Sequence, residues 1–212
     1  MLVIALGFTA QALFGARMII QWIKSEKHQR VLSPSVFWKL SLVASLLFTV
    51  YGFLRHDVVI VFGQLLNYYI YIRNLQLKKD WHTLPHAIRV LLVIAPMAII
   101  FLFLLNGNYQ IPTSPELFSF WIITGLAGQV ILNFRFIYQW YYSEKSNESI
   151  FPIGFWIISI AGSILVVAYG IVREDPVLIV AQGMGLLAYI RNIKISLLKD
   201  KAEIQSILSP RK

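Results

Sequence analysis

The sequence repeats itself. When the chain is shifted by 118 positions it matches its own second half without a gap, and residues 1–80 share 26 identities with residues 119–198. Many of these identities are polar, which a common apolar composition would not produce. They include QW-xx-SEK at 21–27 and 139–145, and YIRN at 71–74 and 189–192. The chain is therefore a tandem duplication of one structural unit.

The composition places both units in a membrane. Hydrophobic residues make up 58% of the chain and charged residues only 14%, outside the range of soluble domains. A helix needs about 20 apolar residues to cross the hydrocarbon layer. The first such run starts at Met1 without a basic leader, so we expect it to be retained as a helix. Seven runs are long enough, at about residues 2–23, 35–54, 58–77, 87–105, 117–142, 153–172 and 176–197.

These runs predict an all-α integral membrane fold of three helices, one linker helix and three more helices. Three helices and one linker return the chain to the same side of the membrane, so the repeats should be parallel and related by a pseudo-two-fold axis along the membrane normal. A shared site between them is the natural place for function. The predicted parts are repeat 1 at 1–80, a linker with the fourth helix at 81–116, repeat 2 at 117–198 and a basic cytoplasmic tail at 199–212.

The distribution of cations predicts the orientation. Fourteen Lys and Arg residues fall in the connections and ends on one face, whereas the other face has only Arg55 and Arg173. Because short cytoplasmic loops collect Lys and Arg, we expect a multi-pass protein of the bacterial inner membrane with a periplasmic amino terminus and a cytoplasmic carboxyl terminus. The net charge of +9 is then a topology signal, and no nucleic-acid partner is expected.

Two arginines inside predicted helices are the main candidates for a binding site. Arg17 and Arg135 lie at equivalent positions about 20 Å into their helices, where an unpaired guanidinium is costly. Gln21 and Gln139 follow four residues later on the same helical faces. One interpretation is that each arginine snorkels to the inner interface. The interpretation we favour is that both face the axis and form a fork-shaped site for a phosphate.

The third helix of repeat 1 adds a polar stripe with spacings of three and four, which keeps its members on one side. The stripe consists of Gln64, Asn67, Tyr68, Tyr71 and Asn74. In repeat 2, Gln182, Tyr189 and Asn192 persist, whereas the equivalents of Asn67 and Tyr68 are lost. The stripe predicts an asymmetric, sugar-sheltering cavity, although hydrogen bonding between helices would also explain it.

Charged turns are repeated on both faces. Arg55 and Arg173 lie in the predicted outer turns, each followed two residues later by an aspartate. The arginine and aspartate either brace the turn or supply an outer anion site. On the inner face Ser25-Glu26-Lys27 and its copy follow an interfacial Trp, and we expect them to form a structured loop over the cytoplasmic mouth.

Motifs that carry enzyme chemistry are absent from the sequence. It has no Gly-rich phosphate loop, no HExxH, no paired intramembrane carboxylates and no cysteine. His82 and His86 have the spacing of metal ligands on a helix, but they bracket Pro85, so no metal site is expected. The sequence therefore predicts a protein that is not an enzyme, with no catalytic residue and no cofactor.

The combination of QW-xx-SEK, Pro, FW, YG-xx-R-x-D and YIRN resembles the lipid A biosynthesis N-terminal domain family. Members carry this three-helix unit alone, doubled, or fused ahead of a lipid-A-disaccharide synthase. The resemblance covers both repeats and implies kinship with the SWEET and PQ-loop transporters, which share the three-one-three architecture. Neither first helix, at 2–23 or 117–142, has the proline hinge of those transporters, and no glycosyltransferase domain is present in the chain.

These observations leave three functions open. The favoured one is a transporter or flippase that moves a polyprenyl-phosphate-linked sugar for lipid A or envelope glycan modification, with membrane lipid and lipid-linked sugar phosphate as partners. The second is a SWEET-like carrier of small free sugars. The third is a non-catalytic partner subunit of a membrane glycosyltransferase. The predicted substrate-binding residues are Arg17, Gln21, Arg55, Gln64, Asn67, Tyr71, Arg135, Gln139, Arg173, Gln182 and Tyr189.

Overall fold

A computed structural model describes residues 2–55, 58–105, 120–172, 174 and 176–208. Seven α-helices and one short 3₁₀ helix occupy these residues, and no strand occurs among them. This confirms the all-α membrane fold with seven helices. The elements are α1 (Leu2–His28), α2 (Ser35–Leu54), α3 (Val58–Leu77), η1 (Asp80–Thr83), α4 (His86–Leu105), α5 (Phe120–Ser146), α6 (Ile153–Val172) and α7 (Pro176–Leu208).

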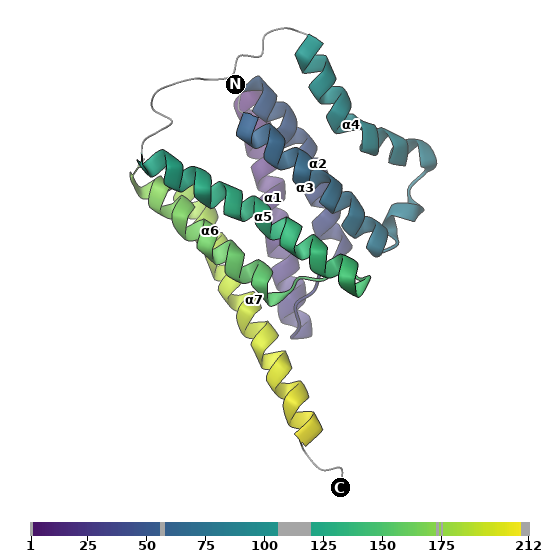
Figure 1. Ribbon diagram of the computed structural model, residues 1–212, viewed down its shortest axis with the longest axis vertical. Helices are drawn as coiled ribbons and strands as arrows, with labels where there is room; N and C mark the ends of the chain where they lie inside the picture. The colour runs from purple at the N-terminus through teal and green to yellow at the C-terminus, as the bar shows by residue number, and fades with distance from the viewer. Residues whose placement is uncertain (1, 56–57, 106–119, 173, 175, 209–212) are drawn as a thin grey trace.

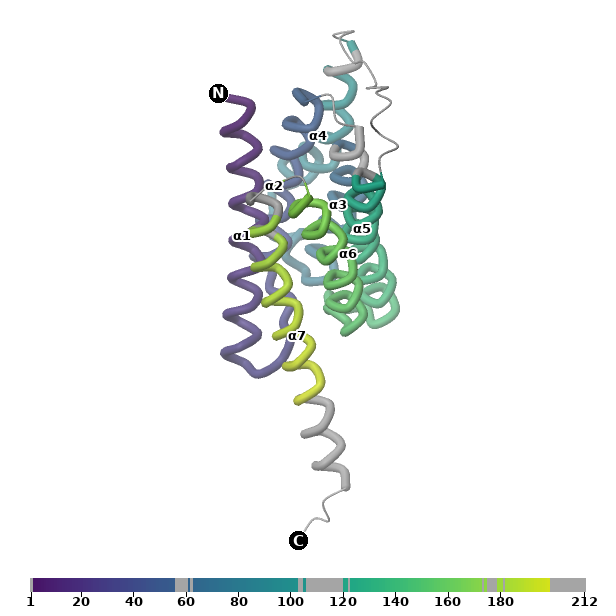
Figure 2. Tube along the Cα trace, turned by 90° about the vertical axis from the view of Figure 1, so that its left-hand side faces the viewer, coloured from purple at the N-terminus to yellow at the C-terminus, as the bar shows by residue number. Residues whose placement is uncertain are grey.

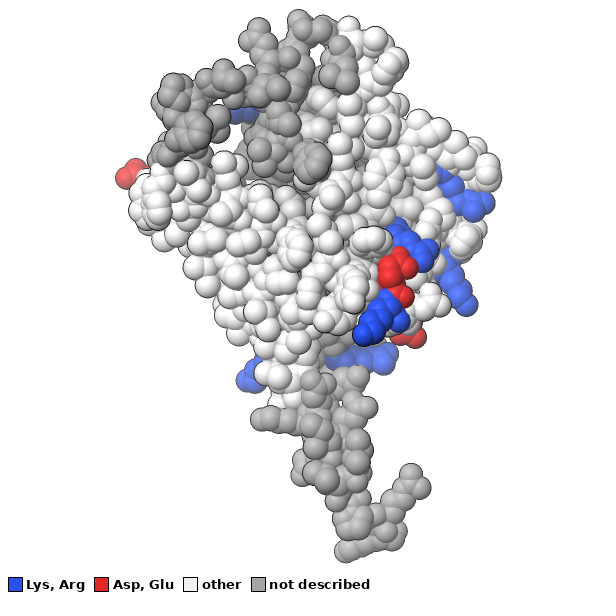
Figure 3. Space-filling model, in the orientation of Figure 1, with Lys and Arg blue, Asp and Glu red and all other residues white. Residues whose placement is uncertain are grey.

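The helices match the predicted apolar runs closely, with three extensions. α1, α5 and α7 each continue past the predicted span, and α7 runs on through residues that we predicted as a tail. α2, α3, α4 and α6 have 20 residues each, which gives about 30 Å of helix and matches the hydrocarbon thickness. By length and composition α1, α2 and α6 can each cross a membrane, and α4 is apolar over His86–Leu102. Charged side chains on the face in Figure 3 gather near one end and leave most of the body uncharged.

The two repeats form two adjacent three-helix units. In repeat 1, α2 packs between α1 and α3, and in repeat 2, α6 packs between α5 and α7. The most extensive helix contacts between the units are those of α3 with α5 and of α1 with α7. Figures 1 and 2 show the start of α1 and the end of α7 at opposite ends of the molecule, and Figure 1 shows α5 running obliquely to α1.

The linker helix α4 packs on repeat 1, at the side away from repeat 2 (Figure 1). Pro96 lies inside α4 and has no N–H, so the carbonyl four residues earlier loses its helical donor. That carbonyl belongs to Leu92, and the Tyr68 hydroxyl of α3 donates to it at 2.7 Å. Tyr68 therefore joins α4 to repeat 1 and satisfies the acceptor that the proline exposes. Repeat 2 has Leu186 at the equivalent position.

The SEK triplets end helices and do not form loops, which corrects our expectation. Ser25-Glu26-Lys27 lies within the last turn and a half of α1, and its copy lies in the same place in α5. Both helices stop at a residue in the left-handed region, Gln29 with φ 49° and Asn147 with φ 53°. The amide of the next residue donates back to the carbonyl of Ser25 or Ser143 at 3.2 Å, as in a Schellman motif.

Candidate functional site

The repeated glutamines join the two repeats to each other. Gln21 of α1 donates to the Asn192 side chain of α7 at 2.9 Å, and Asn192 donates back at 3.3 Å. The symmetric pair is Gln139 of α5 with Asn74 of α3, at 2.8 and 3.1 Å. All four side chains are fully buried. The first helix of each repeat thus holds the third helix of the other, and we call this set of contacts the latch.

Two ion pairs extend the latch to the surface. Arg191 of α7 donates through two nitrogens to the Glu26 carboxylate of α1, and Arg73 of α3 does the same to Glu144 of α5. These two-point contacts use the planar guanidinium of arginine. The hydrogen bonds from Arg191 and Arg73 lower the pKa of both carboxyl groups below their usual value. The identities at QW-xx-SEK and YIRN therefore come from one interface that is built twice.

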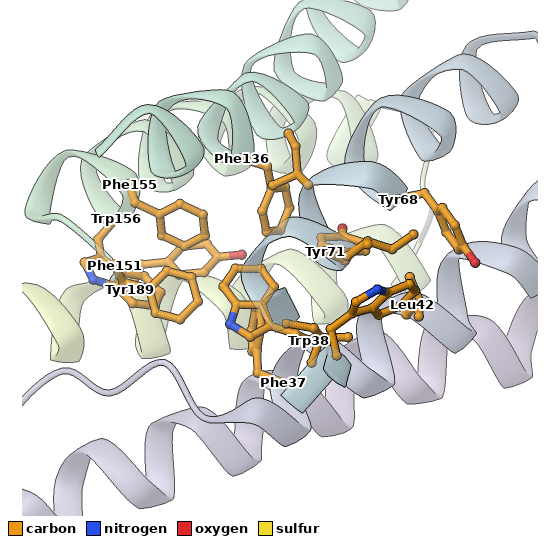
Figure 4. Close-up of a cluster of buried hydrophobic side chains, with 14 residues drawn as sticks. Phe37, Trp38, Leu42, Tyr68, Tyr71, Phe136, Phe151, Phe155, Trp156 and Tyr189 are labelled. Atoms are coloured by element: carbon orange, nitrogen blue, oxygen red, sulfur yellow. The ribbon is translucent and has the colours of Figure 1, made fainter. Parts of the chain in front are cut away.

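Next to the latch, a cluster of aromatic rings fills the space between the two repeats. Figure 4 shows Phe136 of α5 between two groups of rings, Trp38 and Tyr71 on one side and Phe155, Trp156 and Tyr189 on the other. The Phe136 ring lies 5.3 Å from that of Tyr71 and 5.5 Å from that of Phe155, edge to face in both cases. This cluster is shared by both repeats and is almost closed to the outside.

Arg17 extends into this cluster and not towards the membrane interface. Its side chain is 5% exposed, and Nη1 donates to the Ser41 hydroxyl of α2. The rings of Phe14, Phe37, Tyr71 and Phe136 surround the guanidinium carbon at 4.5 to 5.5 Å. Such contacts stabilise a cation through the negative ring faces.

Arg135 has a similar but better-bonded environment. It is 8% exposed, and Nη1 donates to Ser159 of α6 at 3.1 Å and to the Tyr189 hydroxyl of α7 at 2.8 Å. The rings of Phe136, Phe155 and Tyr189 lie 5.0 to 5.4 Å from its guanidinium carbon. Arg135 therefore spans all three helices of repeat 2.

The two guanidiniums contact the same aromatic ring. Their carbon atoms lie 5.3 and 5.0 Å from the centroid of the same Phe136 ring. Within the described residues, the Nε of each arginine is buried and has no hydrogen-bond partner, and no carboxylate bonds to either group. Two buried positive charges with unused donors are suited to a tetrahedral oxyanion such as a phosphate.

The polar stripe divides into a buried part and a half-buried part. Gln64 and Asn67 of α3 are buried, and Asn67 donates to Asn133 of α5 at 2.9 Å. The side-chain oxygens of Gln64 and Asn67 accept no hydrogen bond from the described part of the chain. In repeat 2, Gln182 is half-buried and accepts from Ser163 of α6 at 2.8 Å.

The structure separates the other predicted site residues. Gln21 and Gln139 are occupied in the latch, and Tyr71 and Tyr189 line the arginines. Arg55 is exposed at the end of α2 and is not part of the cluster. Arg173, Asp57 and Asp175 lie outside the described residues. Among the residues that the structure describes, no group of three or more His, Asp or Glu side chains could hold a metal.

Several residues of the site were not predicted from the sequence. Ser41 and Ser159 bond the arginines, Phe136 lies between them, and Asn133 completes the pair with Asn67. The serines carried a signal, because they are identical in both repeats. Phe136 and Asn133 carried none, because their equivalents are Met18 and Gly15.

Comparison with known proteins identifies the family. The model of the family described as "Lipid A Biosynthesis N-terminal domain" matches residues 6–76 and again residues 124–194, two segments offset by 118 positions. The chain belongs to this family. It contains two copies of the domain, as the repeat predicted. No solved structure matches the chain.

Curated relatives carry an enzyme name. The chain is 32% identical to lipid-A-disaccharide synthase of Chlamydia pneumoniae over 90% of its own length, and 30% identical to that of Chlamydia felis over 92%. It spans about a third of the length of each relative, 33% in both cases. These names contradict our expectation that the protein is not an enzyme, and the match covers only part of each enzyme. They also support a context in lipid A biosynthesis.

Proposed function

We propose that this protein binds the phosphate of a lipid-linked sugar between its two repeats and moves that headgroup across the bacterial inner membrane for lipid A or envelope glycan synthesis. The observation that carries the proposal is the pair of buried guanidiniums beside Phe136. A free sugar is neutral and gives no reason to bury two cations. A lipid phosphate brings the missing negative charge and acceptors for the unused Nε donors.

The surrounding residues suit the two ends of such a lipid. Near the arginines, Tyr71 and Tyr189 supply hydroxyl groups and ring faces. On α3 the unpaired oxygens of Gln64 and Asn67 can accept hydrogen bonds from sugar hydroxyl groups. The apolar helix surfaces leave the tail in the bilayer. We place the amino terminus in the periplasm, following the charge asymmetry of the loops.

A second candidate function uses the same site. The relatives named lipid-A-disaccharide synthase extend well beyond the part that this chain covers. We therefore also consider that the membrane unit holds a phosphorylated lipid for glycosyl transfer in the same pathway. Passage of the headgroup across the bilayer separates the two candidates, because holding a lipid does not require its passage.

The arginine pair can be tested directly. Undecaprenyl phosphate is titrated into the purified protein in nanodiscs, with undecaprenol as the uncharged control lipid. We expect Arg17→Ala and Arg135→Ala each to lower the affinity at least about tenfold, and Arg17→Lys to lower it less, because lysine keeps the charge but loses the planar fork. Arg30→Ala removes the same charge from an exposed site and should leave the affinity unchanged.

The outcome separates binding from packing. Equal affinity in the folded alanine variants and the wild type would show that the arginines only pack against the rings. Equal affinity for undecaprenol would show that the phosphate is not recognised. In liposomes, a fluorescent lipid-linked sugar that changes leaflet only with the wild-type protein would favour transport, and binding without passage would favour the second candidate.

A further inference from the structure

The two repeats meet along two seams that the pseudo-two-fold axis relates. The α3–α5 seam and the α1–α7 seam both close at the latch end with the same Gln–Asn and Glu–Arg pairs. Farther along the helices, beside the arginines, the side chains at equivalent positions differ. One seam is filled there and the other is not.

The α3–α5 seam is filled by an amide pair. Asn67 is 2% exposed and donates to Asn133 at 2.9 Å. Gly63 of α3 makes room for the pair, because a Cβ on this residue would lie 2.7 Å from the Asn133 amide nitrogen. Amide groups bonded across a membrane-embedded helix contact hold the helices together. This seam is sealed.

The α1–α7 seam has no side chain at either equivalent position. Shifting by 118 residues places Gly15 opposite Asn133 and Gly185 opposite Asn67 in the alignment of the repeats. Gly15 is exposed, and a Cβ on it would meet no heavy atom of the described neighbours within 4 Å. Gly185 is half-buried, and its nearest such atom is the Tyr189 hydroxyl at 3.0 Å.

These glycines do not draw helices together. Glycines with that role occur between α5 and α6, where a Cβ on Gly128 or Gly162 would lie 2.9 Å from the backbone oxygen of the other. At Gly15 the neighbouring helix is not in contact, so close packing does not explain the missing side chain. The seam is open at the depth where its counterpart is sealed.

The open seam leads to the arginines. Gly15 and Arg17 lie on different faces of α1, but their depths along the helix differ by only about 3 Å. Gly185 lies one turn before Tyr189, whose hydroxyl accepts a hydrogen bond from Arg135 at 2.8 Å. Arg135 is more than nine-tenths buried, and its Nε has no partner in the part of the chain that the structure describes. An unused cationic donor therefore lies behind the seam.

We infer that the α1–α7 seam is the lateral route by which a phosphate-bearing lipid reaches the arginine pair, its tail staying in the bilayer beside Gly15. The inference rests on the proposed function and adds the side from which the lipid enters, because the pseudo-symmetric α3–α5 seam admits no lipid. The buried positive charge selects an anionic headgroup over the neutral lipids that also contact the helices. The single opening means that one lipid is bound at a time.

The chain has no cysteine, so one introduced thiol can act as a reversible plug. Gly15→Cys places it in the open seam, and Phe134→Cys places it on the exposed surface of α5, next to the sealed seam, without breaking the amide pair. Each variant is treated with benzyl methanethiosulfonate, checked by mass and then reduced again. Association of undecaprenyl phosphate is followed by stopped flow in each state, so every variant is its own folding control.

We expect the benzyl group at residue 15 to slow association about tenfold or more, reduction to restore the rate, and the same group at residue 134 to change it less than about twofold. An unchanged rate after modification at residue 15, with Arg17→Ala still lowering affinity, would overturn the route and leave the proposed function intact. Equal slowing at both residues would overturn the restriction of entry to the α1–α7 seam. No binding by the wild-type protein would overturn the proposed function and the route together.

Discussion

The latch and the arginine cluster come from the same duplication but use it differently. In the latch, each contact of α1 with α7 is repeated between α5 and α3 by the same residue types. In the cluster, Arg17 and Arg135 are identical, but the ring of Phe14 packs against Arg17 only, because the equivalent residue of repeat 2 is Leu132. Their neighbours Met18 and Phe136 are not alike at all.

This difference shows why the repeats kept some identities and lost others. A contact across a two-fold axis needs both of its residues in both copies, so a change in one repeat breaks half of the interface. A site on the axis needs each residue only once. The latch therefore kept its sequence twice, whereas the walls of the cluster could diverge and become one-sided.

The largest expected effect tests whether the latch is as symmetric as it looks. Asn74→Ala and Asn192→Ala each remove the donor to the side-chain oxygen of a buried glutamine, and each should lower the free energy of unfolding by about 1–3 kcal/mol. Asn74 also accepts from Ser149 at 2.7 Å, so its loss should cost more. Thermal unfolding in detergent measures both. A neutral effect at either position would mean that the latch does not hold the repeats.

A smaller effect tests the difference between the two core tryptophans. Trp38 donates from Nε1 to Ser33 at 2.8 Å, whereas the buried Nε1 of Trp156 has no partner among the described residues. Trp38→Phe should therefore destabilise the protein by about 1 kcal/mol more than Trp156→Phe, because the volume lost is the same in both. Equal melting temperatures for the two variants would contradict this asymmetry.

The smallest effect concerns the ion pairs of the latch. Arg191 and Arg73 lower the pKa of Glu26 and Glu144 below the usual 4.5, so the stabilisation is present above pH 4.5 and is lost as the pH falls through the folded-state pKa. Because the pairs are partly exposed, the effect is small. The double variant Glu26→Gln, Glu144→Gln should show a shallower loss of melting temperature on acidification than the wild type. Parallel curves would assign the acid loss to other groups.

Much of the fold was predictable because the membrane constrains it strongly. A helix that crosses hydrocarbon must be apolar over about 20 residues, so run lengths alone located α2, α3 and α6 at their observed bounds. The continuation of α1 and α5 was not predicted, because the polar SEK segment reads as a loop. The left-handed residues that end these helices, Gln29 and Asn147, are not glycines and so gave no stop signal.

The candidate site was predictable only where the repeats agree. Arg17 and Arg135 stood out because a cation inside an apolar run is costly, and the structure brings them to one ring. Gln21 and Gln139 share the faces of these arginines, and sequence periodicity cannot reveal that their amides are already bonded to the other repeat. Phe136 and Asn133 occur once, and only the packing of the halves shows their positions.

The bond from Tyr68 to Leu92 also bears on how the protein is made. Both residues precede the whole of repeat 2 in the chain, so the linker helix can dock while the second half is still on the ribosome. The carbonyl that Pro96 exposes is then covered within the lipid before any later helix arrives. Repeat 2, with Leu186 in place of Tyr68, offers the linker no such hydroxyl. The order of the chain therefore allows repeat 1 to take the linker before repeat 2 is present to complete the latch.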